Sequence, residues 1–340
     1  MKTARITVPI LIALLLFSIW VFRHRQSRGS KVILSGPTMG TSYHITYLEK
    51  DNKNYQEEID SLLEAFDVSM STYNPGSEIS YFNTHDTLFF STPYFFPVLI
   101  KSREVYEITR GEFDPTVGPL VNAWGFGPER PDLPDSLQID SLLNLVGFDN
   151  IVFDSGKVWK KITGVQLDFN AIAPGYAADV IGWFLESAGV GNYIVEIGGE
   201  IVCKGYNDRG KPWSTGIEDP TVGLNERQIT AILELTDKAI STSGNYRNFY
   251  VKDGKKYSHE INPLTGYPAE QRLLSATVIA DDCITADAFA TAFMVLGLEE
   301  SIKILEARND LDAYLIFENN SGELDSYKTN LVIENLKNLQ

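Results

Sequence analysis

The sequence predicts an α+β fold with a mixed, largely antiparallel sheet core and flanking helices. Short runs of alternating apolar residues, such as Leu274–Ile279, recur between turn residues and are typical of strands. Other runs, such as residues 54–68, carry apolar residues at helical spacing. The two kinds follow one another in mixed order, which favours α+β over a regular parallel α/β fold.

The first half of the chain is predicted to hold two paired strands, four helices and a hairpin. Gly-Pro and Met-Gly steps between the strands favour a turn, and an Asn-Pro-Gly step follows the first helix. An N-cap at Asp114, with proline next, predicts the start of the third helix. In chain order the elements are the strands Lys31–Leu34 and Thr41–Tyr47, the helices 54–68, Phe95–Thr109, Asp114–Gly125 and 136–146, and the hairpin of Ile151–Phe153 with Val158–Lys161.

The second half begins with a strand end at Leu167 that leads through small residues into a helix reaching Ala188. A buried strand and three more strands are expected to continue an antiparallel sheet, and a polar loop follows them. Listed in order, the remaining elements are the strands Tyr193–Ile197, Glu200–Lys204, Trp213–Ile217 and Ile229–Leu235, the loop Ile240–Tyr246, the hairpin of Phe249–Val251 with Lys256–Ile261, the strand Leu274–Ile279, a helix to Gly297, a helix over 299–308, a strand over 312–317 and a final hairpin around residues 320–322.

The charge is unevenly distributed along the chain. The net charge is −16, but residues 1–30 contain five basic residues and no acidic one. The rest therefore carries 24 basic against 45 acidic residues, a net charge of −21. A body this acidic is a poor binder of nucleic acid, so no nucleic-acid partner is expected.

Residues 6–22 are nearly all apolar, with basic residues on both sides. This length just suffices to span a bilayer. A cleaved signal peptide is the alternative, but no small-residue cleavage site follows Phe22. We therefore predict that residues 1–30 form one N-terminal transmembrane helix with a basic linker, in contact with membrane lipid, and that residues 31–340 form a single domain.

Asp287 and Thr291 stand four residues apart on the helix predicted after Leu274–Ile279, so they share one face. A carboxylate and a hydroxyl are hard oxygen ligands suited to Mg²⁺ or Ca²⁺. Alanines on either side of both residues permit close approach of a ligand. For the neighbouring Asp282 and Thr285, helix capping is the simpler interpretation.

Short motifs throughout the chain together resemble the ApbE family of FAD:protein FMN transferases. The resemblance runs from Thr38 to about Leu298. The matching segments are Met39-Gly40-Thr41, Ser71-Thr72-Tyr73, Phe113 to Pro119, Ala123-Trp124-Gly125, Asp168 to Asp179, Ile197 to Glu200, Ser241 to Gly244, His259 with Asn262-Pro263 and Thr265-Gly266, and Thr285 to Ala292.

The resemblance implies an ApbE-like (T-fold-like) architecture and transfer of the FMN half of FAD to a Thr or Ser hydroxyl of an acceptor protein, with release of AMP. It implies FAD as substrate, Mg²⁺ as cofactor, and an acceptor that is a subunit of a membrane redox complex. With the predicted anchor, this places the chain in the bacterial inner membrane, with its catalytic domain on the periplasmic side. An FAD pyrophosphatase is an alternative that the residues do not separate from the transferase, because both need the same metal and pyrophosphate site. A non-catalytic FAD-binding protein is a further alternative, against which the intact set of Asp287, Thr291 and His259 argues.

The same resemblance assigns roles to individual residues. Asp287, Thr291 and the backbone carbonyl of Ala171 are the implied metal ligands. His259 is the implied catalytic residue near the transferred phosphate, and a histidine can take a proton near neutral pH. The implied FAD contacts are Met39, Tyr73, Ala123, Trp124, Gly125, Asp168 and His259.

Two positions depart from the family pattern. Pro174 stands where many members carry Lys or Glu, and Asn262 stands where an aspartate is common. The first departure removes a side-chain contact to the cofactor, and the second argues against a carboxylate role at Asn262. The glycine-rich turns at Gly175 and Gly198-Gly199 are expected to offer backbone N–H groups to phosphate.

Overall fold

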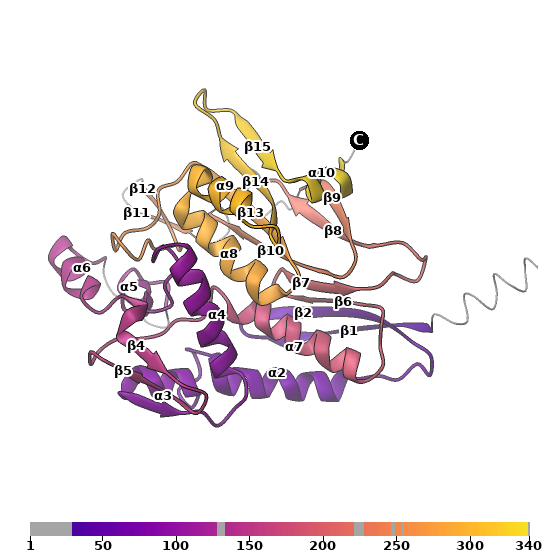
Figure 1. Cartoon of the computed structure of the whole chain (residues 1–340), viewed down its shortest axis with the longest axis horizontal. Coiled ribbons are helices and arrows are strands. Elements are labelled where there is room, and N and C mark those ends of the chain that lie inside the picture. Colours follow the sequence, from indigo (N-terminus) through magenta and orange to yellow (C-terminus); the bar gives the residue numbers. More distant parts are fainter. Residues whose placement is uncertain (1–28, 128–132, 221–227, 246–248, 253–254, 339–340) are drawn as a thin grey trace, which may run out of the picture.

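An eight-stranded antiparallel sheet forms the centre of the molecule. The computed structural model describes residues 29–127, 133–220, 228–245, 249–252 and 255–338. The strand order is β1-β2-β6-β7-β10-β13-β14-β15, and every neighbouring pair is antiparallel (Figure 1). The strands are β1 Ser30–Thr38, β2 Thr41–Glu49, β6 Tyr193–Ile197, β7 Glu200–Lys204, β10 Lys238–Gly244, β13 Leu273–Ala280, β14 Asp312–Glu318 and β15 Leu324–Lys328.

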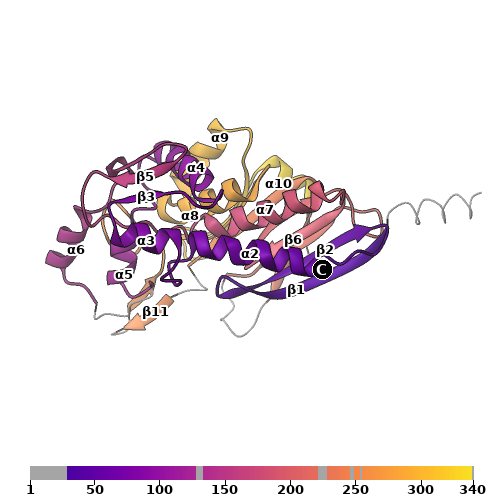
Figure 2. The same cartoon turned by 90° about the horizontal axis from the view of Figure 1, so that it is seen from below.

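One face of this sheet is covered by helices. α8 packs on β10 and β13, α7 packs on β6 and β7 and against α8, and α2 lies beside α7 (Figures 1 and 2). A second layer of helices and loops completes a continuous hydrophobic core on this side. The helices are α2 Gln56–Met70, α4 Phe95–Ile108, α7 Ala173–Ser187, α8 Cys283–Leu296 and α9 Leu298–Ala307.

The other face of the sheet has its own core. Val202 faces the helices, whereas its neighbours Ile201 and Cys203 face a second cluster with Trp213 and Leu233. Successive residues of a strand point to opposite faces, so one run of apolar residues serves both cores. The cover on this side is the sheet β16-β9-β8 with a short helix: β8 Trp213–Glu218, β9 Ile229–Leu235, β16 Leu336–Asn338 and α10 Asn330–Asn335.

The remaining elements lie at one end of the molecule. α5 and α6 lie at the same end as the β11–β12 hairpin, in both views (Figures 1 and 2). A three-stranded sheet, β3-β5-β4, completes this part. The elements are α3 Glu78–Thr84, β3 Thr87–Phe89, α5 Gly118–Ala123, α6 Ser136–Leu143, the 3-10 turn η1 Phe148–Asn150, β4 Ile151–Phe153, β5 Lys157–Lys160, β11 Phe249–Lys252 and β12 Lys255–Ser258.

The predicted α+β class and the antiparallel sheet are confirmed, with several corrections. Residues 240–244, expected in a polar loop, belong to β10, which pairs with β7 and β13. β8 and β9 form a separate sheet instead of continuing the central one. The short elements α3, β3, α10 and β16 had no counterpart in the prediction.

The helix predicted to start at Asp114 begins four residues later, at Gly118. The Asp114 carboxylate accepts hydrogen bonds from the N–H and hydroxyl of Thr116 (2.8 and 2.6 Å) and from the N–H of Phe148 (3.0 Å). Asp114 therefore stabilises a turn and joins it to Phe148, instead of capping a helix. Similarly, the strand predicted over Lys256–Ile261 ends at Ser258, so His259 follows a strand end.

The first hairpin is tighter than expected, because only Met39 and Gly40 separate its strands. Their φ angles are 44° and 71°, the left-handed backbone typical of two-residue hairpin turns. None of the helices within the described ranges has the length and apolar character needed to cross a bilayer. The predicted membrane segment, residues 6–22, lies outside those ranges.

Candidate active site

The candidate site lies where α8 crosses β10. Asp287 and Thr291 face the sheet, where Ser241 lies 3.3 Å from Asp287 and Ser243 lies 3.2 Å from Thr291, measured between side-chain oxygens. Four helical residues advance about 6 Å and two strand residues about 6.6 Å, so the two pairs match in register. One carboxylate and one hydroxyl from the helix, together with two hydroxyls from the strand, thus form one oxygen-rich cluster.

Asp287 is buried, with 3% of its surface exposed. Its Oδ2 accepts a hydrogen bond from the backbone N–H of Gly175, at 2.9 Å, and its Oδ1 accepts the longer one from Ser241. Burial raises the pKa of Asp287 to about 7, although these two donors act in the opposite direction. A buried carboxylate with a raised pKa gains from a nearby cation, which would favour its ionised form.

Gly175 is the third residue of α7, and its N–H has no partner within the helix. The helix starts of α7 and α8 come so close that a Cβ at Gly175 would lie 2.4 Å from the carbonyl oxygen of Cys283 and 2.6 Å from the Cβ of Asp287. Only glycine permits this approach. Gly175 therefore both donates to Asp287 and provides the space for the crossing.

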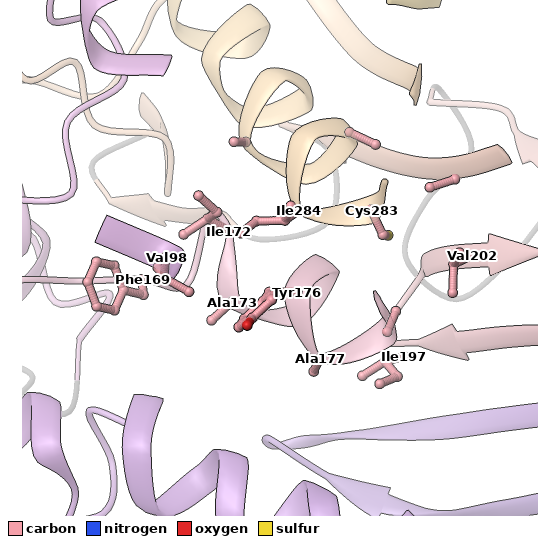
Figure 3. Packing of buried hydrophobic residues seen from close by; sticks show 14 of the residues in the cluster. Val98, Phe169, Ile172, Ala173, Tyr176, Ala177, Ile197, Val202, Cys283 and Ile284 are labelled. Atoms are coloured by element: carbon pink, nitrogen blue, oxygen red, sulfur yellow. The ribbon is translucent and has the colours of Figure 1, made fainter. Parts of the chain in front are cut away.

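Asp179 on α7 makes the reverse contact. Its two carboxylate oxygens accept hydrogen bonds from the N–H groups of Cys283 and Ile284, at 2.8 and 2.9 Å, at the first turn of α8. Figure 3 shows the first turns of both helices, with Ala173 at one and Cys283 and Ile284 at the other, within the main core. Asp179 is structural, as predicted, and it fixes α8 to α7.

Asp282 caps α8, as predicted, by accepting the N–H of Thr285 at 3.0 Å.

The loop before α7 holds the other predicted residues of this region. The N–H of Asp168 donates to the carbonyl of Pro115, at 2.7 Å, and its carboxylate accepts the N–H of Asn170, at 2.8 Å. Burial raises the pKa of Asp168, while the hydrogen bond from Asn170 lowers it. Ala171 lies two residues before α7, near the α7 start that donates to Asp287. The loop thus joins the Pro115 turn to the candidate metal site.

Trp124 is buried, and its ring is not openly presented to a ligand. It is 5% exposed, and its indole N–H donates to the carbonyl of Gly266, at 2.8 Å. It therefore fixes the turn that follows His259. Ala123 ends α5, and Gly125 has a φ of +79° in the turn after it.

His259 lies beside this turn. Its side chain is 37% exposed, its ring meets Phe126 edge to face with centroids 6.3 Å apart, and its Nδ1 lies 3.3 Å from a carboxylate oxygen of Glu260. The structure therefore brings His259 together with Phe126, the residue that follows Ala123, Trp124 and Gly125. These predicted site residues are far apart in the sequence.

Asn262 acts as a turn residue. Its side-chain oxygen accepts the N–H groups of Leu264 and Thr265, and its side-chain N–H₂ donates to Glu112 at 2.7 Å. An aspartate here would repel Glu112, so the departure from the family pattern suits this neighbour.

Met39 and Tyr73 occupy two loops. Met39 lies at the tip of the β1–β2 hairpin and packs partly against the main core. Tyr73 lies between α2 and α3 and is 62% exposed. Such an exposed aromatic ring offers a flat face to a planar ligand.

Two of the expected phosphate donors are already used within the protein. The Gly175 N–H binds Asp287, and the Gly198 N–H donates to the carbonyl of Ser42, at 3.1 Å. These two N–H groups are therefore already engaged within the protein, while phosphate binding by the N–H of Gly199 stays a prediction. Sequence reasoning also missed that Ser241 and Ser243 face the predicted metal pair. Their spacing of two residues was the available signal, because alternate strand residues share one face.

The residue set fits a magnesium ion that is completed by substrate. No group of three or more His, Cys, Asp or Glu side chains suited to a metal occurs in the part of the chain that the structure describes. Mg²⁺ is commonly held by one or two carboxylates, with waters and substrate phosphates as further ligands. One buried carboxylate among hydroxyl groups is a donor set of this kind.

Fold and site together define an α+β protein with a candidate oxygen-ligand metal centre between two helices and the central sheet. The chain belongs to the ApbE family, whose model matches residues 39–315.

Two similar relatives are both named FAD:protein FMN transferase. The one from Vibrio cholerae is 41% identical over 305 residues, which cover 87% of this chain and 90% of the relative. The one from Haemophilus influenzae is 40% identical over 313 residues, which cover 87% and 89%.

Solved structures agree in fold. The structure titled "Flavin Transferase ApbE from Vibrio cholerae" is similar with a TM-score of 0.81 and 39% identity, over 90% of this chain and 99% of that one. The ApbE protein of Thermotoga maritima is similar with a TM-score of 0.78 and 28% identity, over 90% of this chain and 99% of that one.

Proposed function

We propose that this protein transfers FMN from FAD to a Thr or Ser hydroxyl of an acceptor protein and releases AMP. The observation that carries the proposal is the cluster of Asp287, Thr291, Ser241 and Ser243, an oxygen-rich site buried between α8 and β10. The names of the relatives, whose sequences match across most of the chain, support the same activity.

In the proposed site, Asp287, Thr291 and the carbonyl of Ala171 would hold Mg²⁺. The ion would neutralise negative charge on the pyrophosphate and on the departing AMP. Asp287 is held in place for this role by the N–H of Gly175, which fixes one oxygen and leaves the other with only a long contact to Ser241. The protein body is strongly acidic, so a cation is needed to bring the FAD pyrophosphate to it.

His259 takes the proton from the acceptor hydroxyl in this proposal. The hydroxyl oxygen then forms a bond to the phosphorus of the FMN half, the pyrophosphate P–O bond breaks, and AMP leaves with the bridging oxygen. The partial exposure of His259 agrees with access by a second protein. A histidine nitrogen is a suitable base near neutral pH.

FAD itself would be held by residues around this centre. Tyr73 offers an exposed ring face, and Met39 lies at a hairpin tip. Asp168 lies in the loop that leads to the metal ligands. The segment of Ala123, Trp124 and Gly125 lies next to His259 through Phe126, and Trp124 contributes by fixing the 262–266 turn.

We also propose a location and an acceptor class. The apolar segment 6–22 would anchor the chain in the bacterial inner membrane by contact with lipid, with residues 31–340 on the periplasmic side. The acceptor would then be a subunit of a membrane redox complex in the same compartment.

The test combines the full chain with FAD, Mg²⁺ and a candidate acceptor domain, and records the acceptor's intact mass and the AMP released. An acceptor heavier by one FMN, with an equal amount of AMP, is the expected result. AMP and free FMN with unmodified acceptors would instead identify an FAD pyrophosphatase. Bound FAD without AMP, under any divalent metal, would identify an FAD-binding protein and refute the transferase.

A further inference from the structure

Glu260 is a buried carboxylate without a hydrogen-bonding partner. Its side chain is 3% exposed, and neither oxygen has a hydrogen-bond partner in the described part of the chain. Burying an ionised group without compensation is costly, so native proteins keep such groups rarely and usually for a reason. The catalytic machinery proposed above does not use Glu260.

The imidazole of His259 lies beside this carboxylate. Its Nδ1 lies 3.3 Å from the Oε2 of Glu260, within reach of a hydrogen bond but not aligned as one. Catalytic hydrogen bonds are often poorly aligned in a ligand-free protein and become shorter in the complex. Glu260 therefore lies next to Nδ1 of the ring, and Nε2 is the nitrogen that points away from the carboxylate.

The backbone around Glu260 is fixed on both sides of a narrow hairpin. The carbonyl of Glu260 accepts the N–H of Ala269 at 2.7 Å, and the N–H of Asn262 donates to the carbonyl of Tyr267 at 2.8 Å. An antiparallel bridge joins Ile261 to Pro268 between these bonds. The backbone from which the buried Glu260 side chain extends is therefore held in place beside His259.

We propose that Glu260 is a positioning residue for FMN transfer and acts through His259. This inference rests on the proposed role of His259 as the group that takes the acceptor's proton. The Nδ1–H of His259 donates to Glu260, which fixes the tautomer whose Nε2 lone pair faces the reaction. When Nε2 takes the hydroxyl proton, the carboxylate stabilises the imidazolium that forms, as the aspartate does in serine hydrolases.

The kinetic test compares Glu260→Leu and Glu260→Gln with the unaltered full chain. Glu260→Leu removes the carboxylate that accepts the hydrogen bond from Nδ1 of His259. The kcat for FMN transfer should therefore fall about 10- to 100-fold, while KM for FAD changes less than about threefold. Glu260→Gln keeps one acceptor oxygen and should recover part of kcat.

The control for this test is Glu112→Gln. Glu112 binds Asn262 on the same hairpin, and the glutamine retains an oxygen for that bond. Its kcat should stay within about twofold of the unaltered chain. An equal loss of kcat in Glu112→Gln and Glu260→Leu, or no loss in Glu260→Leu, would overturn the proposal.

A second readout does not depend on activity. With ¹⁵N-labelled histidine, NMR at about pH 8 distinguishes the two neutral tautomers, since the free side chain is mostly deprotonated there. The unaltered chain should show His259 protonated at Nδ1, and Glu260→Leu should shift it to the Nε2–H form. The same tautomer in both would overturn the proposal. If the unaltered chain transfers no FMN, the proposed function fails, and this spectrum still decides whether Glu260 orients His259.

Discussion

Asp179 and Asp287 are buried carboxylates on adjacent helices, and each binds the first turn of the other's helix. Asp179 accepts two backbone N–H groups of α8, one on each oxygen. Asp287 accepts one backbone N–H of α7, and its other oxygen has only the 3.3 Å contact to Ser241. Burial raises the pKa of both to about 7.

The two carboxylates differ in the hydrogen-bond partner of their second oxygen. In Asp179 each oxygen accepts a short hydrogen bond from a backbone N–H, so the group holds α7 and α8 together. In Asp287 one oxygen is fixed and the other faces hydroxyl groups that are themselves suitable metal ligands. Equal burial and equal charge therefore do not separate the two carboxylates, whereas the hydrogen-bond partners of each oxygen do.

The largest expected effect is on catalysis at Asp287. Asp287→Asn keeps the shape but removes the charge, so FMN transfer should fall about 10²- to 10³-fold because charge on the departing AMP is no longer neutralised. Intact-mass measurement of the acceptor under single-turnover conditions gives the rate. A rate close to that of the unaltered chain would remove Asp287 from the mechanism.

Gly175→Ala should disturb both carboxylates together. The new Cβ would meet Cys283 and Asp287 at distances that force the two helices apart. We expect the free energy of unfolding to fall by about 3 kcal/mol, from overpacking and the weakened bonds. The control is Gly191→Ala, since nothing lies within 4 Å of a Cβ at Gly191. Equal chemical-denaturation midpoints for the two variants would contradict the close crossing.

Asp179→Asn should lower the free energy of unfolding but have little effect on the rate of FMN transfer. The asparagine N–H₂ cannot accept the second backbone N–H, so we expect a loss of about 2 kcal/mol in the free energy of unfolding. The transfer rate per folded molecule should remain within about threefold of the original. A loss of rate as large as that in Asp287→Asn, with unchanged stability, would reverse the assignment of the two carboxylates.

A further effect concerns the pH dependence of stability. In metal-free protein the folded state keeps a proton on Asp179 up to about pH 7, whereas the unfolded state releases it near 3.8. The free energy of unfolding should therefore fall as pH rises between these values, by about 1.4 kcal/mol per pH unit at most. Asp179→Asn should make this slope shallower. Denaturation at several pH values measures it, and an unchanged slope would exclude Asp179 as a contributor.

Part of this site was predictable from sequence. The four-residue spacing of Asp287 and Thr291 on a helix predicts their common face, and an amphipathic or alternating pattern predicts most long elements. β10 was missed because Ser241, Thr242 and Ser243 look like a polar loop. Ser241 is buried, and all three side chains form hydrogen bonds to α8 or to β13.

The contacts between distant segments were not predictable from local patterns. The bond between Gly175 and Asp287 joins residues 112 positions apart, and that between Trp124 and Gly266 joins residues 142 positions apart. Asp114 has the sequence context of a helix cap, but its partner Phe148 lies 34 residues away. Such pairings depend on how the elements pack, which a single sequence does not specify by periodicity or capping signals.

The central claim is that the second oxygen of Asp287 serves a metal ion, and the Mg²⁺ dependence of FAD binding tests it most directly. Flavin fluorescence would be titrated with the unaltered chain, Asp179→Asn and Asp287→Asn, with Mg²⁺ and with a chelator. We predict that Mg²⁺ tightens FAD binding in the first two proteins and has no effect in Asp287→Asn. An equal effect of Mg²⁺ in all three would contradict the claim.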